Sequence, residues 1–294
     1  MAAVLKNESV FWPVDKIILG YLGFTTLAIL GWWNQVPYAP ALLAAHIAGS
    51  AALVYEVRRP NGTSRVFRHW YPLPYVAACY KEMALLIPAL RQGSADRWLA
   101  HLDLSLWGVH PTVWLERVQT PGLTEFLQWI YTLFVPAVLL PAVLLWKQHR
   151  FPEFRYFAFL IALGYLVSYV GYLIVPARGP RFLLASLQHV PLRGLWLFHG
   201  MQAALDRLES AHYDCFPSGH TELTVLAWWS TRQLEKRLLF WLYFAYTLSI
   251  IFATVYLRYH YTVDVFAGVA VALFLITVAP FIYRKLKAKD IGLD

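Results

Sequence analysis

Charged residues are scarce in this chain of 294 residues, since Asp, Glu, Lys and Arg together make up only 14% of it. Soluble domains carry about 25% charged residues and about 45–50% apolar residues. Hydrophobic residues here reach 59%. The composition therefore excludes an ordinary globular enzyme, a disordered segment and a nucleic-acid module. Cysteine is scarce as well, because Cys79 and Cys215 are the only two, too few for a disulfide scaffold. The composition is that of an integral membrane protein.

The apolar pattern predicts eight membrane-spanning helices, because a spanning helix needs roughly 20 mostly apolar residues. Lys81 and Glu82 interrupt the third of them. We expect the spans at residues 12–33, 39–57, 70–90, 123–146, 156–176, 217–231, 238–257 and 263–283. The predicted fold class is an all-α polytopic membrane helical bundle, with residues 1–294 forming a single integral membrane domain.

Most of the net charge of +8 lies in four clusters on one side of this bundle. The clusters are Arg58, Arg59, Arg65 and Arg68; Lys147, Arg150 and Arg155; Arg232, Lys236 and Arg237; and Arg284, Lys285, Lys287 and Lys289. Basic residues accumulate in cytoplasmic loops, so we expect both termini to be cytoplasmic. Residues 91–122 and 177–216 are then extracytoplasmic, and we expect an interfacial helix near 95–108. The N-terminal spans and this outer interfacial segment together cover residues 10–122. The positive charge thus indicates orientation rather than nucleic-acid binding.

Three short segments with reactive side chains lie at the extracytoplasmic ends of predicted spans, where short loops can bring them together. They are Val175-Pro-Ala-Arg-Gly-Pro-Arg-Phe182, Cys215-Phe-Pro-Ser-Gly-His-Thr221 and Tyr256-Leu-Arg-Tyr-His-Tyr-Thr-Val-Asp264. In the second, Pro217 suits the first position of a helix, and the free N–H groups of a helix start bind anions. Ser218 adds a hydroxyl, Gly219 permits close approach, and His220 can donate a proton to a leaving oxygen. Read alone, this segment is equally typical of a plain helix start with an interfacial histidine.

The third segment pairs His260 with Asp264, four residues apart and therefore on one face of a helix. A carboxylate that holds one imidazole nitrogen leaves the other free to attack. Arg258 can bind a phosphate in bidentate fashion, and Arg178 and Arg181 add two further cations. The alternatives are a His–Asp pair that closes an interfacial turn, and arginines that snorkel to the interface. Arginines on the outer side run against the positive-inside bias, which favours a specific role for them.

In this order, Arg-Gly-Pro-Arg, Pro-Ser-Gly-His and His-x-x-x-Asp resemble the type 2 phosphatidic acid phosphatase superfamily of membrane lipid phosphatases and phosphotransferases, over residues 176–268. Residues 254–265 look especially like the inositol phosphorylceramide synthase-like branch. The chain departs from the superfamily pattern at Ile174, where Lys is usual, and at Thr254, where Arg is usual.

The resemblance implies that His260 is the nucleophile that forms a phosphohistidine, that Asp264 orients it and that His220 protonates the leaving group. It implies that the phosphate is bound by Arg178, Arg181, Ser218, Gly219 and Arg258. It also implies that no metal or other cofactor is needed, since arginines and amides stabilise the charge. The expected substrate is a membrane lipid phosphoester, with water or a polyol such as inositol as the acceptor.

Four further residues are candidates for the substrate pocket: Glu222, Asp103, His110 and Lys81. Each has a structural alternative, because ionisable side chains inside a span also form polar contacts within the bundle, and interfacial helices carry such residues anyway. We expect a lipid phosphatase or headgroup transferase of the cell membrane with its site on the extracytoplasmic side. A membrane transporter and a non-catalytic lipid-binding protein are the alternatives. Transporters tend to show internal repeats, and none is visible here.

Overall fold

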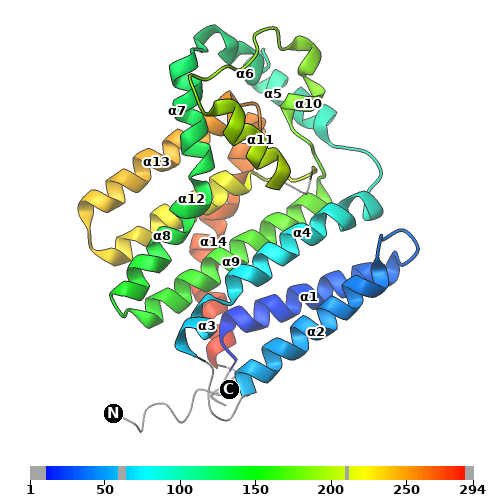
Figure 1. Ribbon diagram of the computed structural model, residues 1–294, viewed down its shortest axis with the longest axis vertical. Coiled ribbons are helices and arrows are strands. Elements are labelled where there is room, and N and C mark those ends of the chain that lie inside the picture. The colour runs from blue at the N-terminus through cyan, green and yellow to red at the C-terminus, as the bar shows by residue number, and fades with distance from the viewer. Residues whose placement is uncertain (1–10, 59–63, 209–211, 289–294) are drawn as a thin grey trace.

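The computed structural model describes residues 11–58, 64–208 and 212–288, and within these ranges the chain is helical, with fourteen α-helices and no strand. This confirms the all-α fold class. Arg59 and Lys289 of the basic clusters lie outside the described residues. The helices α4 (Pro72–Leu90), α9 (Phe151–Ile174) and α14 (Thr262–Ala288) run along the middle of the molecule, with the hairpin of α1 (Pro13–Gly31) and α2 (Ala39–Arg58) on one side (Figure 1).

Six helices in the described ranges are long and apolar enough to cross a membrane: α1, α2, α4, α9, α13 (Arg237–Tyr256) and α14. The expected span at 123–146 is divided into α7 (Pro121–Thr132) and α8 (Phe134–Lys147), which are bent by 45°. If this pair crosses as one span, the number of spans is seven. The protein is therefore a polytopic membrane helical bundle.

The expected span at 217–231 is the short helix α12 (Gly219–Thr231), which has 13 residues. At 1.5 Å per residue such a helix is about 20 Å long, shorter than a hydrocarbon core of about 30 Å. Most of its residues are buried, because α8, α9, α13 and α14 all pack against it. The total of eight spans and the orientation in the membrane stay predictions.

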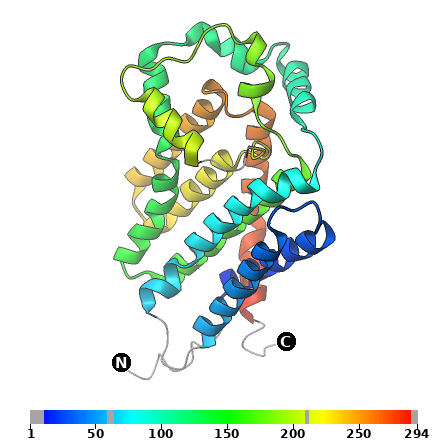
Figure 2. The same cartoon turned by 45° about the vertical axis from the view of Figure 1, so that its right-hand side comes forward.

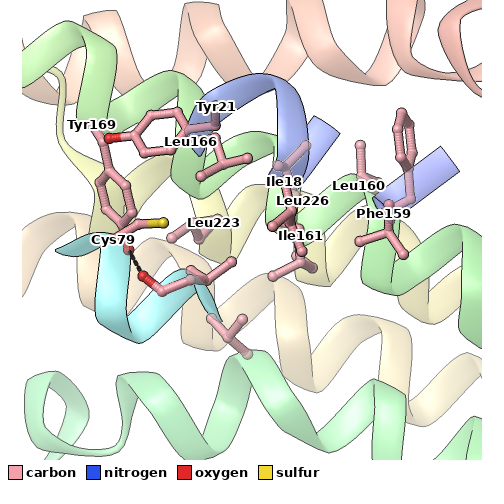
Figure 3. Close-up of a cluster of buried hydrophobic side chains, with 14 of the residues drawn as sticks. Ile18, Tyr21, Cys79, Phe159, Leu160, Ile161, Leu166, Tyr169, Leu223 and Leu226 are labelled. Atoms are coloured by element: carbon pink, nitrogen blue, oxygen red, sulfur yellow. Dashed lines mark hydrogen bonds between the residues drawn. The ribbon is translucent and has the colours of Figure 1, made fainter. Parts of the chain in front are cut away.

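The main core forms where α1, α4, α9 and α12 meet (Figure 3). Ile18 and Tyr21 of α1 pack toward Leu166 of α9 and Leu223 of α12, all of them buried. Cys79 of α4 belongs to the same cluster and is 4% exposed, so it is a small residue of the core. Because α12 packs into this core, the core determines where the residues at the N-terminus of α12 lie.

The short helices divide between the two ends of the bundle. One end carries α5 (Asp96–Trp107), α6 (Pro111–Trp114), α10 (Pro180–Leu183) and α11 (Phe198–Leu208), and the opposite end carries α3 (Arg65–Trp70) (Figures 1 and 2). Three short 3₁₀ turns complete the chain at Leu115–Val118, Ala185–Leu187 and Arg232–Leu234. The helix expected near 95–108 is thus present as α5.

A lysine hydrogen bond and an ion pair join helices at the end that carries α3. Lys16 Nζ donates to the Leu286 carbonyl at 2.6 Å, which joins the start of α1 to the end of α14. Arg68 of α3 forms an ion pair with buried Asp15 at 2.5 Å. Because α14 begins in the third motif and ends beside Lys16, these basic residues lie at the opposite end of the bundle from the motifs. Arg68 belongs to the first of the four basic clusters, and its position at this end agrees with the predicted separation.

Candidate active site

The three motif segments form one hydrogen-bonded unit at the end of the bundle that carries α5 and α10. The joining backbone hydrogen bonds, each 3.1 Å long, run from Cys215 N to the Ala177 carbonyl, from Arg181 N to the Arg258 carbonyl and from Ser218 N to the Asp264 carbonyl. Gly179 allows this close approach: its φ is 98°, and a Cβ there would lie 2.6 Å from the Tyr259 carbonyl oxygen. The expectation that the three segments meet is therefore confirmed.

The helix α12 starts at Gly219, two residues later than the sequence suggested. Pro217 precedes the helix, and Ser218 is the N-cap, whose hydroxyl accepts from Thr221 N at 3.3 Å. The Ser218 side chain is fully buried in this capping role. The N–H groups at a helix start lack intrahelical acceptors, so those of Gly219 and His220 remain available to an anion. Gly219 also packs closely on α9, since a Cβ there would lie 2.6 Å from Tyr172 Oη.

The two motif histidines face each other, with ring centroids 5.7 Å apart at an interplanar angle of 64°. His260 is 3% exposed, and its Nδ1 lies 3.6 Å from Asp264 Oδ2. The sequence suggested that both residues share a helix face. Instead His260 precedes α14, and the turn before the helix brings them together, with Asp264 Oδ2 accepting from Tyr261 N at 2.9 Å.

Cys215 is a member of this cluster that sequence reasoning did not assign to the site. Its thiol donates to Asp264 Oδ2 at 2.8 Å, and Sγ lies 3.6 Å from His260 Nδ1. Burial raises the pKa of Cys215 well above its ordinary value, and the nearby Asp264 carboxylate raises it further. The thiol is thus a protonated hydrogen-bond donor. Its position behind the histidine follows from the pairing of residues 177 and 215, which no local pattern reveals.

Aromatic rings hold His220 in place. Tyr131 of α7 stacks on the His220 ring at 4.5 Å on one side and on the Tyr259 ring at 4.2 Å on the other. Phe134 of α8 contacts the same imidazole at 4.4 Å. The bend between α7 and α8 thus lies directly at His220. These aromatic residues were absent from the sequence-based site, because their sequence positions carry no motif.

The three expected phosphate-binding arginines lie in different environments. Arg258 is 7% exposed, and its Nη2 pairs with Glu116 at 2.8 Å and donates to the Val190 carbonyl at 2.5 Å. Arg181 pairs with Asp206 of α11 at 2.9 Å. Arg178 is exposed, with its guanidinium 4.3 Å from the centre of the Phe182 ring. Each of these arginines therefore already has a protein partner.

The amphipathic helix α5 holds two of the motif segments through buried carboxylates. Asp96 accepts from Arg178 N and Gly179 N, both at 2.8 Å, and from the Tyr261 hydroxyl at 3.1 Å. Asp103, a candidate for the substrate pocket, is 1% exposed and caps α14. Its carboxylate accepts from Thr262 N at 2.9 Å, Thr262 Oγ1 at 2.6 Å and Val263 N at 3.0 Å. Asp103 thus positions the segment that contains His260.

The other pocket candidates are spread around the unit. Glu222 is fully buried one turn into α12, and its Oε2 accepts from Ser168 Oγ at 2.5 Å. His110 is part of the wall of an outer cavity of about 530 Å³ that also includes Glu116. Lys81 is exposed and donates to the Leu208 carbonyl of α11 at 2.5 Å. The structure therefore does not bring these residues into one pocket with Asp103.

Glu82, the neighbour of Lys81 in α4, makes a contact within the bundle. Its Oε1 lies 3.0 Å from His46 Nε2 of α2, and both side chains are buried. The other nitrogen of His46 lies 2.7 Å from Thr26 Oγ1 of α1. This agrees with the structural alternative for an ionisable residue inside a span.

Two facing histidines, with a carboxylate behind one of them and a helix start beside the other, lie together at one end of the membrane helical bundle. The family model of the PAP2 superfamily matches residues 97–278, more than half of the chain, and the chain belongs to this superfamily. No curated protein and no solved structure matches it. Membership identifies the protein as a phosphatase or phosphotransferase of the membrane.

Proposed function

We propose that the protein transfers a phosphoryl or phosphoester group from a membrane lipid through a phosphohistidine intermediate, on the extracytoplasmic side and without a metal. The observation that carries this proposal is the constellation of His220, His260 and Asp264. The two rings are 5.7 Å apart, and the carboxylate lies 3.6 Å from Nδ1 of His260.

The geometry supports the following steps for the proposed reaction. Because Asp264 faces Nδ1 of His260, the other nitrogen, Nε2, carries the lone pair that attacks phosphorus. The bond from phosphorus to the leaving oxygen breaks as the N–P bond forms, and His220 gives its proton to that oxygen. In the second half, His220 takes a proton from water or an alcohol, whose oxygen attacks phosphorus and releases His260.

Charge on the phosphate is stabilised by the arginines and by the start of α12. The N–H groups of Gly219 and His220 and the nearby Arg178 and Arg181 supply positive potential. Arg181 now pairs with Asp206, which is about half exposed, so an anionic substrate competes for this arginine at low cost. Arg258 binds the phosphate if the phosphate replaces Glu116 as its partner; otherwise Arg258 holds the outer segment that contains Glu116.

A lipid substrate is supported by an apolar groove of about 710 Å³ between α1, α9 and α14. Phe216 and Pro217 of the second motif segment are part of its wall, so a lipid chain in the groove places its headgroup near His220. The outer cavity with His110 and Glu116 in its wall adjoins Arg258 and has room for a polyol such as inositol. Transfer to an alcohol and hydrolysis by water share the first half of the reaction.

The test is an assay of the purified protein in detergent with phosphatidic acid, an isoprenyl pyrophosphate and an inositol phospholipid, each with and without free inositol. We expect phosphate release or a new phosphoester with at least one lipid, no loss in EDTA, and loss of activity in His260→Ala. His189→Ala, an exposed outer histidine, is the matched control and keeps its activity. Full activity in His260→Ala would contradict the mechanism, and loss in EDTA would contradict metal independence.

The orientation has its own test, because both native cysteines are buried. Ser105→Cys on α5 and Arg284→Cys near the end of α14 place exposed thiols at opposite ends of the bundle. In intact cells an impermeant maleimide should label position 105 and should label position 284 only after permeabilisation. The reverse pattern overturns the extracytoplasmic site.

A further inference from the structure

Cys215, His260 and Asp264 come close enough for one ion to contact all three. Sγ lies 2.8 Å from Asp264 Oδ2 and 3.6 Å from His260 Nδ1, and Nδ1 lies 3.6 Å from Oδ2. All three side chains are buried. The second oxygen of Asp264, Oδ1, is buried without a hydrogen-bond partner among the described residues. We propose that these three residues bind a zinc ion and that the bound ion inhibits the enzyme.

The spacing of the donor atoms matches a tetrahedral zinc site. With Zn–S near 2.3 Å and Zn–N and Zn–O near 2.1 Å, tetrahedral ligand atoms lie about 3.4 to 3.6 Å apart. The two separations that involve His260 Nδ1 are both 3.6 Å. The Sγ to Oδ2 separation is shorter because a thiol proton bridges these atoms. When zinc replaces this proton, the separation widens by about 0.8 Å and the proton is released to solvent.

The donor set selects the metal. One sulfur, one imidazole nitrogen and one carboxylate oxygen suit zinc, whereas magnesium and calcium prefer oxygen ligands throughout. Three protein ligands leave a fourth position for water. The backbone also holds the ligands in place, because Cys215 N donates to the Ala177 carbonyl and Ser218 N donates to the Asp264 carbonyl. Little conformational freedom is lost on binding, which favours affinity.

Zinc at this position should inhibit the proposed reaction by changing the tautomer of His260. Attack by Nε2 requires the proton of a neutral His260 ring to be on Nδ1, facing Asp264. A metal ion takes the lone pair of Nδ1, so the ring proton moves to Nε2 and the attacking lone pair is lost. The ion also takes the Asp264 carboxylate that orients the ring. This inhibition rests on the proposed function, whereas binding of the ion does not.

Binding is tested with cobalt(II) on the purified full-length protein in detergent, because a thiolate bound to cobalt gives a near-ultraviolet charge-transfer absorption. We expect one equivalent of Co²⁺ to produce this absorption and Zn²⁺ to remove it. Cys215→Ser keeps a hydroxyl that can donate to Asp264 but lacks the thiolate, so the absorption should vanish. Cys79→Ser replaces the other buried cysteine and should keep it. Wild-type protein without the absorption overturns the site, whether or not Cys215→Ser folds.

Activity supplies the second measurement. Zn²⁺ should inhibit the wild-type protein and Cys79→Ser, and Cys215→Ser should require roughly tenfold more Zn²⁺ for the same fractional inhibition. Mg²⁺ should not inhibit. Equal sensitivity of Cys215→Ser and wild type, or cobalt binding without inhibition, overturns the inhibitory role. If no substrate is turned over at all, the proposed function fails while the cobalt absorption still decides the zinc site.

Discussion

Replacing Asp96 with alanine should separate the motif segments, although Asp96 itself is not one of the proposed catalytic residues. Asp96 lies on α5 and touches neither histidine in the reaction proposed above, yet it accepts hydrogen bonds from the first and third motif segments. Its removal leaves the amide of Gly179 and the hydroxyl of Tyr261 without partners in buried positions. Arg178 is exposed, so water can reach its amide.

An unsatisfied buried donor costs about 1–3 kcal/mol, so the two buried donors predict a loss of about 2–6 kcal/mol in the free energy of unfolding. Asp206→Ala is the matched control, because it also removes a carboxylate that contacts the first motif. Its ion pair with Arg181 is solvent-accessible, with Asp206 49% exposed, and such a pair contributes at most about 1 kcal/mol.

The assay compares thermal unfolding of the two variants in detergent, followed by phosphate release from the lipid that the wild type prefers. Asp96→Ala should unfold at a clearly lower temperature and lose most of its activity, while Asp206→Ala stays close to wild type in stability. Equal shifts for both variants would refute the reasoning, because the difference rests only on burial and on the number of donors left unpaired.

Three further predictions concern packing around the site and within the bundle. Gly219→Ala places a Cβ 2.6 Å from Tyr172 Oη and should lower the free energy of unfolding by roughly 1–3 kcal/mol. The double variant Gly219→Ala/Tyr172→Phe should recover part of this loss in thermal unfolding, and no recovery contradicts the clash. Glu82→Ala breaks a buried pair with His46 and should lower the unfolding temperature without changing kcat per folded molecule; a lowered kcat assigns Glu82 to the reaction. Tyr131→Ala frees the His220 ring and should lower kcat more than Tyr131→Phe, which keeps the stacked ring; equal losses contradict the stacking role.

The sequence predicted that His220 and His260 lie together, because each belongs to a short motif of fixed spacing. It also placed both motifs at one end of the bundle through the distribution of basic residues. It was less successful with side chains that act on distant partners. Asp103 was expected to face a substrate and instead caps α14, since the choice between these roles depends on which helix packs beside α5.

Arg258 illustrates the same difficulty. Its motif position suggested a phosphate ligand, but Glu116 lies more than a hundred residues away along the chain and pairs with it at 2.8 Å. The full span expected at 217–231 stays a prediction, because α12 has only 13 residues. Apolar composition alone cannot distinguish a helix that crosses a bilayer from a shorter one that is buried among other helices, and α12 is buried by its neighbours.

Composition, charge and local motifs were enough to predict an α-helical membrane protein, the end of the bundle that carries its basic residues, and the two histidines that lie together at the other end. These features follow from composition, charge distribution and local spacing, which need no knowledge of packing. The packing of the helices was needed to see that Cys215 lies behind His260, that α5 holds two motif segments with buried carboxylates, and that Tyr131 stacks on His220. Each of these contacts joins residues far apart in the chain, so each depends on how the helices pack.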